Sequence, residues 1–81
     1  MYRSIVTTIM KQYFFLVCSV INELAIPIKI FLQLDEAIKW GRRRATLSQK
    51  NGYDTQYHLY KQLIARTSEL EFVMKLPPFK E

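Results

Sequence analysis

The chain has 81 residues and a formal net charge of +5, and 49% of its residues are hydrophobic and 23% charged. These values fit one small globular domain spanning residues 1–81 and exclude a disordered tail. Two glycines cannot build a glycine-rich phosphate loop, and one cysteine with one histidine can form neither a disulfide nor a Cys/His zinc site within a single chain.

The first predicted element covers residues 3–24. Its longest apolar run, YFFLVCSVI at 13–21, is much shorter than the roughly 20 residues that a membrane span needs. At 100° per residue, most apolar side chains of this segment fall on one side and the polar ones on the other. We therefore expect an amphipathic helix rather than a signal peptide or a membrane-spanning segment.

The second predicted element covers residues 27–50. Pro27 suits the first turn of a helix, where its missing N–H leaves no hydrogen bond unmade. An apolar stripe follows at helical spacing: Phe31, Leu34, Ile38, Gly41 and Ala45. Because Gly41 and Ala45 are small, the helix is expected to lie close against a neighbour. The pair Asn51-Gly52 predicts its end, with one of the two in the left-handed conformation.

The third predicted element covers residues 54–76. Asp54 is a suitable N-cap, and Pro77-Pro78 would end the helix. One helical face would carry Leu59, Tyr60, Leu63, Ile64, Thr67, Leu70 and Met74. Together the three elements predict an all-α fold, an antiparallel three-helix arrangement with helices at roughly 3–24, 27–50 and 54–76.

Catalytic chemistry is not expected. A nucleophile–histidine–acid set would need His58, whose loosely plausible partners are Ser48, Asp54 and Cys18, and no local spacing brings them together. The carboxylate pairs Asp35-Glu36 and Glu69/Glu71 are explained as solvated pairs on helix surfaces. The chain is therefore expected to be no enzyme and to have no cofactor or metal.

Residues 42–52 carry Arg42, Arg43, Arg44 and Lys50 without an acidic residue, so this segment holds +4 of the net charge. Helical geometry separates the arginines. Arg42 lies beside the apolar stripe, where it can extend along the edge of the core. Trp40, Arg43, Arg44 and Leu47 share a patch on the far side, at i, i+3, i+4 and i+7.

Three interpretations of this basic segment are open. The arginines can simply complement the negative end of the helix dipole, with Trp40 in a wide core. Alternatively, Trp40, Arg42, Arg43, Arg44 and Leu47 form a protein-docking surface, since Trp and Arg are enriched among interface hot spots. Alternatively, the chain binds nucleic acid through Arg42, Arg43, Arg44, Lys50 and Tyr53.

The hypothesis carried forward is a non-enzymatic, cytoplasmic regulator, inhibitor or adaptor, of the compact kind found in phage and plasmid systems, which binds a protein partner through a helix face. Self-association through the same patch is a variant, because a short chain gains from additional burial. A further alternative is peripheral membrane association through the apolar first helix.

Overall fold

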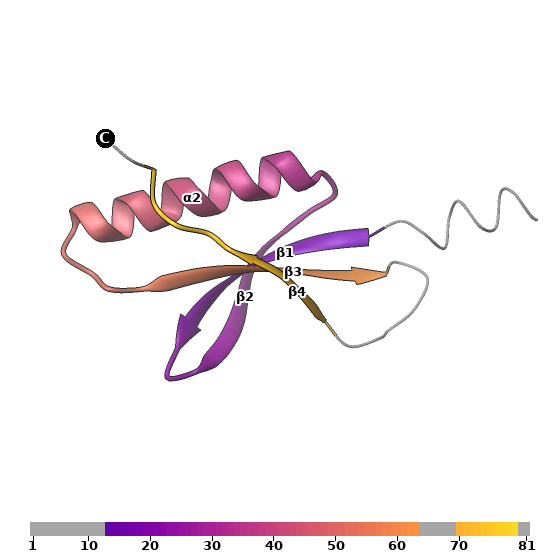
Figure 1. Cartoon of the computed structure of the whole chain (residues 1–81), viewed down its shortest axis with the longest axis horizontal. Coiled ribbons are helices and arrows are strands. Elements are labelled where there is room, and N and C mark those ends of the chain that lie inside the picture. The colour runs from indigo at the N-terminus through magenta and orange to yellow at the C-terminus, as the bar shows by residue number, and fades with distance from the viewer. Residues whose placement is uncertain (1–12, 64–69, 80–81) are drawn as a thin grey trace, which may run out of the picture.

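The computed structural model describes residues 13–63 and 70–79. In chain order its elements are β1 (Tyr13–Ile21), β2 (Leu24–Phe31), α2 (Leu34–Lys50), β3 (Gln56–Leu63) and β4 (Glu71–Lys75). The four strands form one antiparallel sheet in the order β2-β1-β3-β4. Figure 1 shows α2 lying across one side of this sheet.

The all-α, three-helix prediction is therefore wrong. Residues 13–21 and 24–31 are strands where helices at 3–24 and 27–50 were expected, and residues 3–12 lie outside the described residues. Residues 56–63 and 71–75 are strands where a helix at 54–76 was expected. Of the predicted helices, the portion from Leu34 to Lys50 exists. The membrane alternative also loses its basis over the described residues, since no apolar helix forms between Tyr13 and Leu24.

The strand β1 lacks the period-2 alternation of a half-buried strand because it is an interior strand of the sheet and is apolar on both faces. It pairs with β2 on one side and β3 on the other, and Leu16, Val17 and Cys18 are all buried. A strand of this kind reads as a continuous apolar run in which period 2 is invisible. The aromatic and β-branched content of YFFLVCSVI is typical of strands, and the segment forms one.

A two-residue turn, Asn22-Glu23, joins β1 to β2, with φ of 52° and 68°. Positive φ at both central positions matches the turns whose twist suits a hairpin. Pro27, expected in the first turn of a helix, instead lies in edge strand β2 beside a bulge that interrupts the register between Val17 and Cys18. Edge strands and bulges are the sheet positions that accept proline.

The helix α2 ends as the sequence predicts. Gly52 has φ of 79°, its N–H donates to the carbonyl of Gln49, and the N–H of Tyr53 donates to that of Ser48. This pair of bonds is a Schellman motif, which satisfies carbonyls that the helix end leaves open. Asp54, predicted as an N-cap, is exposed in the loop that leads to β3.

The core lies between α2 and the sheet. Its buried members from the helix are Ala37 and Ala45, and from the sheet and the segment after it Val17, Tyr57, Leu59 and Leu76. A Cβ built on Gly41 would lie 3.3 Å from Leu76 Cγ and 3.4 Å from Val17 Cγ1, and nearer still to Leu76 Cδ1. The predicted close approach at Gly41 and Ala45 is confirmed, and the sheet is the neighbour that it approaches.

We expect Gly41→Val to destabilise the protein by about 2 kcal/mol, because the new side chain overpacks a filled contact with Leu76 and Val17. Lys39→Val, on the exposed side of the same helix, makes the same β-branched substitution without that contact and is expected to cost about 0.5 kcal/mol. Urea unfolding of both variants measures the difference. Equal losses in the two variants would contradict the close packing.

Candidate basic and aromatic docking site

Trp40 lies at the junction of α2 and β2 and is half-buried rather than fully outward. Its ring packs against Phe31, with centroids 5.8 Å apart. Two cations lie near the same indole, Lys29 Nζ at 5.2 Å and Arg44 Cζ at 5.6 Å from its centroid. Cation–π attraction therefore holds both positive groups beside the tryptophan. We call Lys29, Trp40, Arg43, Arg44 and Leu47 the basic patch.

Lys29 is the member of the basic patch that sequence reasoning missed. It belongs to β2, where it pairs with Val17 of β1 on the face that α2 covers. Its proximity to Trp40 arises because the chain folds back between β2 and α2. No signal of helical spacing could have found it, since the segment was assigned to the wrong secondary structure.

The outer part of the basic patch is open to solvent. Arg43 and Arg44 are exposed, and Leu47 is 54% exposed. Over residues 13–63 and 70–79, neither arginine has a carboxylate within 4 Å, although Asp35 and Glu36 lie on the same helix. The patch thus combines positive charge not paired with any described carboxylate and an exposed aliphatic side chain.

Arg42 is turned to the opposite flank of α2, as the helical geometry predicts, and it holds the segment that follows β4. Its Nε–H donates to the carbonyl of Pro77 at 3.1 Å, and its guanidinium lies 4.3 Å from the centroid of Phe79. The N–H of Phe79 donates to Thr46 Oγ1 at 2.9 Å. Arg42 is therefore occupied in fixing the C-terminal segment, and we place it outside the basic patch.

A hollow of about 390 Å³ adjoins the basic patch at the end of α2. Arg44, Leu47 and Tyr53 line it together with Ser48, Asn51, Thr55 and Tyr57. Tyr53 is 69% exposed, so one aromatic ring of the nucleic-acid set is accessible beside Arg44. Lys50, the remaining member of that set, is exposed in the last turn of the helix.

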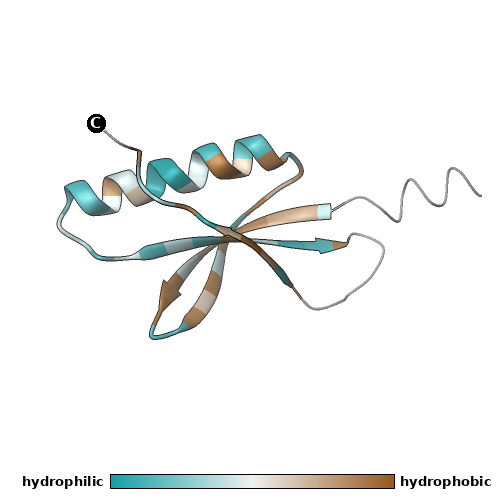
Figure 2. Cartoon of the chain, in the orientation of Figure 1, coloured by the Kyte–Doolittle hydropathy of each residue, from teal (hydrophilic) through white to brown (hydrophobic). Residues whose placement is uncertain are grey.

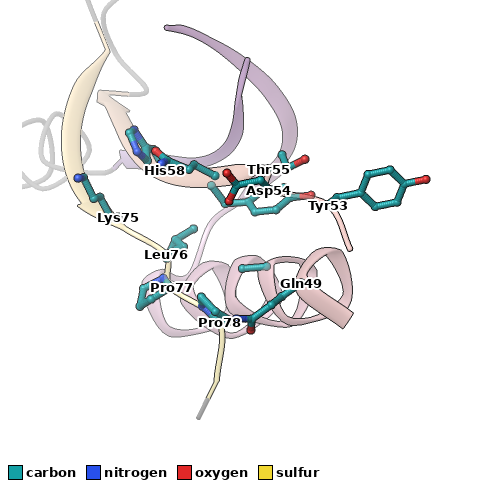
Figure 3. A pocket seen from close by; sticks show the side chains of 12 residues that line it. Gln49, Tyr53, Asp54, Thr55, His58, Lys75, Leu76, Pro77 and Pro78 are labelled. Atoms are coloured by element: carbon teal, nitrogen blue, oxygen red, sulfur yellow. The ribbon is translucent and has the colours of Figure 1, made fainter. Parts of the chain in front are cut away.

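A second hollow, of about 280 Å³, lies between the end of α2, the loop before β3 and the Pro77-Pro78 segment (Figure 3). Figure 3 shows Gln49 and the two prolines on one side of it, with His58 and Lys75 at its far end. Of the described residues, no group of three or more His, Cys, Asp or Glu side chains is arranged to hold a metal ion.

Cys18 and His58, two members of the nucleophile–histidine–acid set, are paired neighbours on adjacent strands. Burial raises the pKa of the Cys18 thiol above its ordinary value, so the thiol is protonated at neutral pH. Burial, and secondarily the charge of Lys75, lower the pKa of His58 below 6.5. Neither shift favours a thiolate–imidazolium pair, which is the form that nucleophilic cysteines use.

Comparison with protein-family models, curated proteins and solved structures gives no match to this chain. Within the described ranges, no helix has the length and apolar character that crossing a membrane requires.

Because the pKa of His58 is lower in the folded protein than in the unfolded chain, the unfolded state binds more protons just below pH 6.5. We expect the free energy of unfolding to fall as the pH drops through 6.5 toward the folded pKa. His58→Gln should remove this part of the pH dependence, since the chain has no other histidine. Unfolding by urea at a series of pH values tests this; an unchanged slope in the variant would contradict it.

Proposed function

We propose that the protein acts without catalysis, as a regulator, inhibitor or adaptor that binds an acidic protein surface through the basic patch. The observation that carries this proposal is the pair of cations held beside Trp40, with Arg43 exposed and no described carboxylate neutralising Arg43 or Arg44. We place this activity in the cytoplasm, in keeping with a chain that has a single cysteine.

Preorganised charge supports this proposal. Cation–π contacts restrict Lys29 and Arg44 before any partner arrives, so less side-chain entropy is lost on binding. Arginine also presents a planar fork of donors that matches a carboxylate in two bonds. An acidic side chain of a partner is thus a suitable ligand for the exposed arginines.

The exposed aliphatic part of the surface favours a protein over a nucleic acid. Leu47 is exposed and lines the adjoining hollow together with Arg44, and a phosphate backbone would gain little from this aliphatic side chain. Protein interfaces combine such apolar side chains with Trp and Arg. Arg42, the first arginine of the nucleic-acid set, is engaged by the carbonyls of Pro77 and Pro78.

Arg44→Glu is expected to weaken binding of an acidic peptide about tenfold or more, which corresponds to about 1.4 kcal/mol. The sole tryptophan reports binding directly, because it lies within the basic patch. We therefore propose titrating a glutamate-rich peptide at low salt and following Trp40 fluorescence. Trp40 itself is left intact, since its packing on Phe31 ties it to the fold.

Lys75→Glu is the matched control, because it reverses one exposed charge at the outer strand β4, away from the basic patch. It is expected to leave peptide affinity unchanged apart from a small general effect of net charge. Equal losses of peptide affinity in Arg44→Glu and Lys75→Glu would mean that the peptide binds only through non-specific charge attraction. Tighter, steeply salt-dependent binding of an oligonucleotide of the same charge would favour the nucleic-acid alternative.

A further inference from the structure

The face of the sheet opposite α2 is the second large surface of the described structure (Figure 1). Residues paired directly across antiparallel strands share a face, so the register assigns its members. These are Phe14, Leu16, Cys18 and Val20 of β1, Ala25, Pro27 and Ile30 of β2, Gln56, His58, Tyr60 and Gln62 of β3, and Phe72 and Lys75 of β4. We call this set the open face.

Large apolar side chains stand exposed at both margins of the open face. Ile30 on β2 is 60% exposed and Phe72 on β4 is 53% exposed, whereas Leu16 and Cys18 between them are buried. Phe72 makes edge contacts with His58 and Tyr60, with ring centroids 5.4 and 5.7 Å apart. Figure 2 shows hydrophobic colouring along much of β1, β2 and β4, to which residues of both sheet faces contribute. The open face thus carries exposed apolar side chains at both margins and aromatic contacts between β3 and β4.

The open face is nearly uncharged in a protein that carries +5 overall. Lys75, at its edge, is the one charged residue that the strand register places on it. His58 is neutral at pH 7, since burial and Lys75 lower its pKa. Two copies of this basic chain would repel each other through their basic patches, whereas their open faces can meet with little repulsion.

We propose that the open face is the interface of a homodimer, in which two copies pack sheet against sheet. Each helix α2 then lies on the outside of the dimer, and both basic patches remain accessible. The arrangement places the self-association surface apart from the basic patch, in contrast to the expectation that one surface serves both. It does not depend on the proposed function.

The dimensions of the open face suit this occupant. Four strands about 4.8 Å apart, with about six residues each at roughly 3.3 Å per residue, cover about 400 Å² in projection. This projected area is about half of the ~800 Å² that each partner contributes to a standard interface, and the side chains that stand out from the sheet add accessible surface to it. Packing through the edge of β2 is less suitable, since Pro27 and the bulge interrupt that edge.

Sedimentation equilibrium of the full chain tests the proposal. The wild type is expected to sediment at twice its chain mass of 9.7 kDa. Ile30→Glu and Phe72→Glu place a carboxylate on the open face at exposed positions, so each is expected to sediment as a monomer with an unchanged circular dichroism spectrum. Leu47→Glu, an equally exposed leucine on the helix side, is the control and should remain dimeric.

Three results would overturn the proposal. A wild type that stays monomeric while Ile30→Glu lowers its melting temperature would mean that the chain's own residues cover the open face. A monomeric wild type whose melting temperature is unchanged by Ile30→Glu would mean that the open face binds a different protein. A dimer that Leu47→Glu dissociates, and Ile30→Glu does not, would place the interface on the helix side.

Discussion

The close approach of α2 to the sheet at Gly41 is the contact on which the rest of the structure depends. A hydrogen in place of a side chain lets Leu76 and Val17 reach the helix backbone, and Ala37 and Ala45 keep the same helix face flat. With this face turned inward, the helix has one flank toward β2 and the other toward the segment after β4. Trp40 meets Lys29 of β2 and Arg44 lies over the Trp40 ring, whereas Arg42 reaches the segment after β4. The basic patch is a consequence of that orientation.

The same contact leaves the molecule with two chemically different surfaces. One helix covers one side of the sheet, so the positive charge of α2 and the apolar open face lie on opposite sides of the described structure (Figures 1 and 2). The proposed binding of an acidic partner and the proposed self-association therefore use different residues. In the proposed dimer, a small chain with a limited core would gain stability by covering its second sheet face, while its charged surface would remain available.

Local chemistry predicted part of this structure, and it failed where pairing between distant segments decides the outcome. The Asn51-Gly52 helix end, the small residues that face the core and the separation of Arg42 from Arg43 and Arg44 all follow from one helix. The strands were not predicted from the sequence, because β1 is apolar on both faces and β3 has apolar residues at both period 2 and period 3.6. The Asn22-Glu23 turn was not predicted either, because it contains no glycine. Lys29 joins the site only once β2 lies beside α2.

The central claim is that α2 packs through Gly41 onto paired strands. The most direct measurement is the set of nuclear Overhauser effects in the full chain in solution. We predict contacts from the Gly41 α-protons to the methyl groups of Leu76 and Val17, and cross-strand contacts between Val17 and Leu59. The fold and both proposals built on it would be contradicted if these contacts were absent and helical i to i+3 contacts were observed through residues 56–63.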